Sequence, residues 1–463
     1  MKTVMRTGKT LILGVAFALS FASLPSLAEM SPGELARLDA DLTPLGAERA
    51  GNAEGTIPAW TGGIGSAAEA GYPGFKPGGH HPDPYKGGAP LFTITAKNMA
   101  QYADRLTVGQ KTMLKTYSGF HMKVYPSHRS AAYPQRFYDA IREIAPVAKL
   151  TKTGNGVENA ARGIPFPIPE NGRETIWNHL LRYRNDTAMI RNAGQAPVMR
   201  NGRYTMVRIV DAAFPVYHLP DSTPDNIDNV IIKFQQRIMA PPRLAGTLLF
   251  VHETLDQHEE QRRAWMYNPG QRRVRRAPNI AFDNPSIASD SLSTADQYDM
   301  FNGSLERYHW KLLGKKELYV PYNAYRLHSA KLRYKDIIKP LHLNPAHLRY
   351  ELHRVWVVEA TLKEDTRHVY KRRTFYLDED SWQILHTDQY DNRNQLWRVS
   401  EGHVINYYDR PLLWTTLEVH YDLQSGRYLA FGLNNEEKFT IDFESDLEEE
   451  DFSVAAMRRG GKR

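Results

Sequence analysis

The second half of the chain alternates apolar and polar residues over short segments, a pattern typical of β-strands. Segments 263–267 and 272–276 form one pair, and Pro269 and Gly270 between them suit a tight hairpin turn. A second pair, 368–377 and 382–390, is joined by the polar residues 378–381. Further segments of this kind are 244–255, 352–362, 396–404 and 412–423. Their spacing predicts an antiparallel meander and a mainly β (α+β) fold.

One segment in this half has helical periodicity instead. Within residues 224–239 apolar side chains recur every three or four positions, and Pro241 and Pro242 follow directly. We therefore predict an amphipathic helix that begins near Pro224. Its apolar face would carry Ile227, Val230, Ile231, Phe234 and Ile238.

The first half reads as short helices and irregular chain. Ser31 and Glu34 have the spacing of a capping box, and Pro32 suits the first helical position. Proline and glycine are too frequent in residues 46–90 for regular elements. We expect this stretch to wrap across the surface of a folded body as a long irregular arm.

A local unit, Trp177-Asn178-His179, ends this half. We expect Trp177 to be buried, and Asn178 and His179 to hydrogen-bond segment 164–169, which three X-Pro steps hold extended. A contact with a ligand or partner is the alternative.

The chain is divided into four parts. Residues 1–28 are a targeting segment, 29–184 a helical and irregular wrapping region, 185–441 an antiparallel sheet and 442–463 a polar, charged tail. Seven acids lie in 442–451 and four bases in 457–463, so we expect a solvated end.

The N-terminus has the pattern of a secretory signal peptide. Three basic residues precede the apolar run 11–24, and small residues at 26 and 28 permit cleavage after Ala28. The chain has no cysteine, which excludes disulfides and thiolate metal sites and suits folding in a Gram-negative periplasm. Removal of residues 1–28 lowers the formal charge from +7 to +4, too mild an excess to imply a polyanion partner. We expect a periplasmic protein.

The most basic stretch, residues 261–278, falls on the predicted hairpin. Alternation places Trp265 and Tyr267 on one face of their strand, and it places Arg273 and Arg275 together on a face of the next. Export argues against a nucleic-acid partner. An arginine ladder on the wet side of the sheet is the simple interpretation, and contact with an anionic head group or an acidic partner surface is the alternative.

Sequence motifs for catalysis and cofactor binding are absent. The chain has no HExxH, G-x-S-x-G, P-loop or dinucleotide fingerprint. The His80-His81 pair lies in a proline-rich loop without a matching second pair. Carboxylate pairs such as Glu351 with Glu359 are common in long β proteins. We expect no cofactor, no metal and no enzymatic activity.

Several longer segments resemble a proteobacterial periplasmic family of unknown function in the outer-membrane lipoprotein-sorting (LolA/LolB-like) superfamily. The resemblance covers essentially the whole chain after residue 28. The matching segments are GTIPAWTGG (55–63), LFTITAKNMAQYADRLTVGQ (91–110), VYPSHRSAA (124–132), GIPFPIPENGRETIWNHLLRYR (163–184), AWMYNPGQRRVRRAP (264–278), LLGKKELYVPYNAY (312–325) and the 376–390 hairpin.

The resemblance implies a large, curved antiparallel sheet that forms an incomplete barrel, with helices over its concave face. It also implies work beside an outer-membrane β-barrel protein and a resistance-nodulation-division (RND) type inner-membrane transporter. The sorting carriers of the superfamily are far shorter, so region 46–184 is additional. Whether that region fills the cavity decides whether a carrier function is retained.

Three functions follow from these observations. The first is a periplasmic carrier for a lipidic or hydrophobic ligand, because a curved sheet covered by the helix 224–239 would leave an apolar groove. The second is an adaptor that bridges envelope proteins through its sheet edge or arginine ladder, and the third is an enzyme that modifies envelope lipid or polysaccharide. Candidate groove residues are Trp265, Tyr267, Trp356, Val358, Phe375 and Trp382, with Ile227, Ile231 and Phe234 on the covering helix, and Arg273 and Arg275 as partner or head-group contacts.

Overall fold

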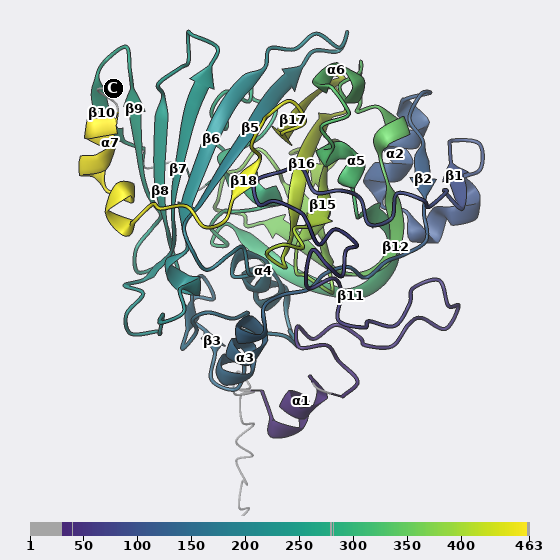
Figure 1. Ribbon diagram of the computed structural model, residues 1–463, viewed down its shortest axis with the longest axis horizontal. Helices are drawn as coiled ribbons and strands as arrows, with labels where there is room; N and C mark the ends of the chain where they lie inside the picture. The colour runs from purple at the N-terminus through teal and green to yellow at the C-terminus, as the bar shows by residue number, and fades with distance from the viewer. Residues whose placement is uncertain (1–29, 39, 278–279, 281, 461–463) are drawn as a thin grey trace, which may run out of the picture.

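The computed structural model describes residues 30–38, 40–277, 280 and 282–460. The expected signal peptide, residues 1–28, lies outside the described residues. Within them, one 16-stranded sheet dominates the fold and curves around the centre of the molecule without closing into a barrel (Figure 1). The prediction of a mainly β fold with a large curved sheet is confirmed.

The strands follow chain order only in part. Side by side, they are β1 (Phe92–Ile94), β2 (Met122–Val124), β12 (Tyr350–Leu362), β13 (Arg372–Asp378), β14 (Ile384–Tyr390), β15 (Leu396–Asn406), β16 (Leu413–Asp422), β17 (Arg427–Leu433), β5 (Met189–Val198), β6 (Val207–Phe214), β7 (Val230–Ala240), β8 (Leu248–Thr254), β9 (Arg263–Asn268) and β10 (Arg273–Arg276). β11 (Tyr308–Pro321) pairs with β12, and β18 (Ile441–Asp442) pairs with β5. Neighbours are antiparallel except β2 and β12. The predicted hairpins β9–β10 and β13–β14 are confirmed.

Short helices connect and cover these strands. The α-helices are α1 (Pro32–Arg37), α2 (Val108–Thr116), α3 (Gln135–Ile144), α4 (Gly172–Leu180), α5 (Tyr325–His328), α6 (Tyr334–Ile337) and α7 (Val454–Gly460). The 3-10 helices are η1 (Met99–Arg105), η2 (Val216–His218), η3 (Ala295–Met300), η4 (Pro345–His347) and η5 (Glu449–Phe452), and β3 (Lys149–Leu150) pairs with β4 (Val157–Glu158). The capping box predicted for Ser31 and Glu34 starts α1.

The two faces of the β11–β15 half of the sheet are both covered. Val358 on β12 packs into a core cluster with Trp177 of α4, whereas its neighbour Val357 packs into another with Leu45 of the N-terminal arm. Successive residues of a strand point to opposite faces, so α4 and the arm lie on opposite sides of β12. Figure 1 shows α4 inside the curve, between β11 and the β5–β8 half.

The Trp177-Asn178-His179 unit follows the prediction in two of its three residues. Trp177 is fully buried, and Asn178 accepts from the Phe166 nitrogen at 3.0 Å and donates to its oxygen at 2.6 Å. His179 instead contacts the carbonyl oxygens of Trp382 and Phe301, each at 3.0 Å. The prediction for His179 is wrong because α4 turns this ring toward the sheet and away from segment 164–169.

The helix predicted over residues 224–239 is wrong. Its second half belongs to strand β7, which pairs with β6 and β8, and Ile227 lies just before this strand in the core. A β-bulge between Val230 and Ile232 shifts the alternation, so apolar positions recur at intervals that imitate a helix. The β-branched run 230–232 fits a strand better.

The expectation of a solvated C-terminal tail is also wrong. Within this segment, η5 covers Glu449–Phe452 and α7 covers Val454–Gly460, and α7 packs against the β8–β10 end of the sheet (Figure 1). Phe452 and Met457 are 1% and 0% exposed. Met457 packs with Leu248, Phe250 and Tyr267, so two apolar side chains anchor an otherwise charged segment.

Candidate binding cavity

A cavity of about 340 Å³ lies against the β5–β9 half of the sheet. Strands β16 and β17 and the connection through η3 complete its walls, and Leu180 and Arg184 of the N-terminal region also line it. Its volume falls within the range of small-molecule sites, about 300–1,000 Å³. The additional N-terminal region therefore contributes to the lining of the cavity without filling it.

A row of paired residues runs across the sheet along this cavity. Arg191 on β5 pairs with Asp211 on β6, Asp211 with Gln236 on β7, Gln236 with Leu249 on β8, and Leu249 with Met266 on β9. Cross-strand partners share one face of a sheet, and all five residues line the cavity. The row is polar over β5–β7 and apolar over β8–β9.

The apolar side of the lining is built by alternation. Ile232 and Phe234 on β7 face the cavity together, and Val251 on β8 is the cross-strand partner of Phe234. The side chain of the residue between Ile232 and Phe234 points to the other face of the sheet. Aliphatic and aromatic side chains thus meet over three adjacent strands, as in sites for hydrophobic ligands.

The polar end of the row centres on Arg191, which is 4% exposed. Its guanidinium lies over the rings of Trp414 at 5.1 Å and Phe431 at 5.9 Å, and Nη2 donates to the Thr416 oxygen at 3.2 Å. The ring faces stabilise a cation in a desolvated position. The arginine is therefore held in place largely by aromatic contacts and backbone.

Two carboxyl groups in the lining have raised pKa values. Burial raises the pKa of Asp211 to about 6, although Gln236 donates to it at 2.9 Å. Burial and the charge of Asp299 raise the pKa of Glu418 to about 8. Glu418 is therefore mostly protonated at pH 7 and can both accept and donate hydrogen bonds.

Paired charges complete the lining. Arg182 and Arg184 both contact the Asp299 carboxylate at 2.5 Å, and together they outweigh burial and hold the pKa of Asp299 below its ordinary value. Arg262 donates to Glu253 at 2.6 Å. Glu253 neutralises Arg262, whereas Arg182 and Arg184 share the single negative charge of Asp299. The cavity therefore combines an apolar wall with polar groups that can orient a ligand.

The predicted groove residues of β9 lie on its outer face. Trp265 and Tyr267 pack on the side covered by α7, whereas Met266 between them lines the cavity. Alternation correctly separates Trp265 and Tyr267 from Met266. The aromatic face is the predicted groove side, whereas the cavity lies on the Met266 face. Met266 could have been found by its alternation alone.

The other four candidates belong to the packed β12–β14 region. Val358 and Phe375 pack under α4, at 0% and 1% exposure. Trp382 stacks on Trp356 with ring centroids 6.0 Å apart, and its Nε1 donates to the Leu45 oxygen of the arm at 3.1 Å. The structure therefore places Val358, Phe375 and Trp382 in the core and the partly buried Trp356 against it. None of the four lines the cavity.

Of the three residues predicted to cover the groove from a helix, two do line the cavity. Ile231 and Phe234 reach it from strand β7, whereas Ile227 does not. The arginines of β10 are exposed, and Arg275 is the cross-strand partner of Met266. Arg275 thus continues the cavity row at the edge of the sheet, and Arg273 lies two residues away on the same face.

None of the polar residues that line the cavity is among the candidates predicted from the sequence. Arg191 and Asp211 lie on the consecutive strands β5 and β6, whereas Glu418 comes from β16, about two hundred residues later, and only the sheet order brings it to the same cavity. Among the described residues, side chains with metal-ligand chemistry group together at His353, Asp378 and Asp380, outside the cavity lining.

Comparison with known proteins places the chain in a family. The family model "Protein of unknown function (DUF1329)" matches residues 93–458. "Uncharacterized protein PA3922" of Pseudomonas aeruginosa is 49% identical over 99% of this chain and 100% of its own length.

Three solved structures are similar at low identity. A domain described as an outer membrane lipoprotein-sorting protein, from Vibrio parahaemolyticus, is 16% identical and covers 62% of this chain and 97% of its own, with a TM-score of 0.42. A DUF1329 family protein from Desulfovibrio piger is 13% identical, with 59% and 92% coverage and a TM-score of 0.41. A LolA superfamily protein from Nitrosomonas europaea is 12% identical, with 62% and 100% coverage and a TM-score of 0.35. The resemblance to a family of unknown function is thus confirmed: the chain belongs to the DUF1329 family.

Proposed function

We propose that the protein is a periplasmic binding or carrier protein for a lipidic or other hydrophobic ligand, held in the cavity against β5–β9. The cavity itself carries the proposal, because it joins apolar side chains from three adjacent strands to a polar end. A ligand with an apolar body and one polar group suits this division. Its body would lie against Leu249 and Met266 and its polar group near Arg191 and Asp211.

Export rests on the signal-peptide pattern of residues 1–28. Among the described residues, no helix combines the length and the apolar character needed to cross a bilayer. Each buried methylene contributes about 0.8 kcal/mol, so a short chain is enough for micromolar affinity. Delivery to or from an envelope transporter would require only that the cavity exchange its content with a partner.

The test combines native mass spectrometry of protein isolated from the periplasm with displacement of the apolar dye N-phenylnaphthylamine. We expect a co-purifying lipid-sized mass and dye binding that fatty acid displaces. Leu249→Trp fills the apolar end and should weaken dye binding at least tenfold, whereas Met239→Trp changes an exposed residue of β7 and should not. Absence of any co-purifying ligand together with equal dye binding by both variants would refute the proposal.

An adaptor function is the second candidate, favoured by β10. This strand is the last in the sheet, so one of its edges has no partner strand among the described residues, and Arg273 and Arg275 are exposed. Such an edge can pair with an acidic surface of an outer-membrane β-barrel or RND-type transporter. Charge reversal, Arg273→Glu with Arg275→Glu, should abolish capture of that partner; unaffected capture would exclude this surface.

A further inference from the structure

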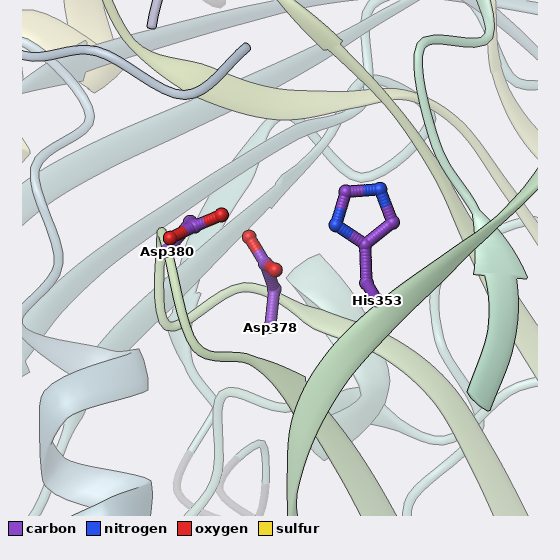
Figure 2. A group of neighbouring side chains, drawn as sticks. All are labelled: His353, Asp378 and Asp380. Atoms are coloured by element: carbon purple, nitrogen blue, oxygen red, sulfur yellow. The ribbon is translucent and has the colours of Figure 1, made fainter. Parts of the chain in front are cut away.

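A buried group of side chains lies away from the cavity, where β12 meets the β13–β14 turn. His353 comes from β12, Asp378 ends β13 and Asp380 lies in the turn; they are 1%, 0% and 6% exposed. One ligand-type atom from each lies within 4.8 Å of the others. Figure 2 shows the Asp378 carboxylate between Asp380 and the imidazole of His353.

The imidazole is oriented by a second carboxylate behind it. His353 Nε2 lies 3.3 Å from Glu351 Oε2, and Glu351 is itself fixed by Arg349 at 2.6 Å and by Asn323 at 3.0 Å. A ring that donates Nε2–H to Glu351 keeps a lone pair on Nδ1. The other ring nitrogen faces Asp378 (Figure 2). A histidine backed by a carboxylate in this way is typical of metal ligands.

The carboxylates leave acceptor capacity at the same place. Asp378 Oδ2 accepts from Ser381 Oγ at 2.5 Å and from the Tyr322 hydroxyl at 3.1 Å. Its Oδ1 is buried and has no hydrogen-bond partner among the described residues. Asp380 accepts from Arg129 Nη2 at 2.6 Å and Nε at 2.9 Å, one bond to each oxygen. A buried carboxylate oxygen without a partner costs free energy unless a donor or cation meets it.

We propose that His353, Asp378 and Asp380 bind one divalent transition-metal ion, of the zinc or manganese kind. One imidazole nitrogen with two carboxylate oxygens is a ligand set for such ions, whereas calcium and magnesium prefer oxygen alone. The ion would tie the β13–β14 turn to β12. Because Arg129 holds Asp380 from the N-terminal region, the ion would also fix where that region docks on the sheet.

The test measures metal in the purified full-length mature chain. After a metal-stripped sample is refolded with Zn²⁺ or Mn²⁺ and passed over a desalting column, we expect one equivalent by plasma mass spectrometry. We also expect the ion to raise the thermal midpoint, and Mg²⁺ or Ca²⁺ at the same concentration not to do so. Asp378→Asn and His353→Gln should lose at least nine-tenths of the bound metal.

A matched control is Asp296→Asn. Asp296 is equally buried and contacts His368 at 3.1 Å and Arg373 at 2.8 Å, so its loss perturbs a comparable group and should leave metal content unchanged. Less than one-tenth of an equivalent in the wild-type chain, with no midpoint shift, would overturn the proposal and leave a structural ion cluster. Equal metal retention by Asp378→Asn and the wild type would also overturn the proposal. If a variant fails to fold, the metal content and thermal midpoint of the wild type decide whether the site binds metal.

Discussion

Replacement of Glu418 by glutamine should stabilise the protein, and increasingly so as the pH rises. The carboxyl is buried on the cavity wall, accepting from Thr415 Oγ1 at 3.0 Å and the Met300 nitrogen at 3.2 Å. Burial, and then the charge of Asp299, raises its pKa from 4.5 to about 8. The folded state therefore disfavours the ionised form, and stability falls as the pH rises from 4.5 to about 8.

The size of the stability change follows from the difference between the ordinary and the folded-state pKa of Glu418. One pKa unit corresponds to about 1.4 kcal/mol, so the ionisable carboxyl costs under about 1 kcal/mol at pH 5 and about 3 kcal/mol at pH 7. Glutamine keeps the shape and one acceptor oxygen but cannot ionise. The stability gain of Glu418→Gln over wild type should therefore grow by a few kcal/mol between pH 5 and pH 8.

The assay is urea unfolding of both proteins at pH 5, 6, 7 and 8, followed by tryptophan fluorescence. Any fixed effect of the amide on local hydrogen bonds cancels when the pH values are compared. Glu359→Gln, which removes a partly exposed carboxylate paired with Arg372, should show no comparable trend. A stability difference that stays constant from pH 5 to pH 8, or that shrinks, would show that burial does not hold Glu418 in its protonated form.

Three further predictions concern a buried ion pair, the packing of α4 and the docking of the C-terminal tail. Despite burial, Asp388 raises the pKa of His386 to about 9, so the pair stabilises the fold below pH 6.5 and this contribution is lost as the pH rises toward 9. Asp388→Asn should lower the free energy of unfolding by about 3–5 kcal/mol at pH 6, measured by urea unfolding. A loss below about 1 kcal/mol would exclude a charged pair. Gly172→Ala places a Cβ 2.9 Å from the β11 backbone and should cost about 1–3 kcal/mol, measured by thermal unfolding, whereas Gly74→Ala meets open space and should not. Met457→Ala should cost about 2–5 kcal/mol and speed hydrogen exchange in α7 and β8–β10; unchanged exchange there would contradict the docking of the tail.

The hairpins could be predicted because their determinants are local. Pro269 and Gly270 set the turn between β9 and β10, and the polar residues 378–381 set the turn between β13 and β14. Segment 224–239 shows the limit of such patterns. A single bulge at Val230 shifts strand alternation toward helical spacing, and only the pairing with β6 and β8 decides between the two.

Packing at a distance could not be predicted from the same patterns. The charged tail is ordered by Phe452 and Met457, and what they pack against lies about two hundred residues earlier in the chain. Similarly, His353 and the two aspartates of the β13–β14 turn become neighbours only through the register of β12 with β13.

The cavity could not be predicted because a substantial part of its wall is polar. Arg191 and Asp211 are charged residues on strand faces that are otherwise largely apolar, with Ile209 and Ala213 beside Asp211, and a charged residue is ordinarily assigned to solvent. Here that face is covered by η3 and its connection, so both residues are buried. The ring of Trp414 stabilises the Arg191 cation, Gln236 donates to Asp211, and burial raises the pKa of Asp211. A search for aromatic residues alone therefore selects the outer face of β9 and the β12–β14 core. The cavity side of this sheet is marked instead by buried polar residues paired in register with apolar ones, from Arg191 across to Met266.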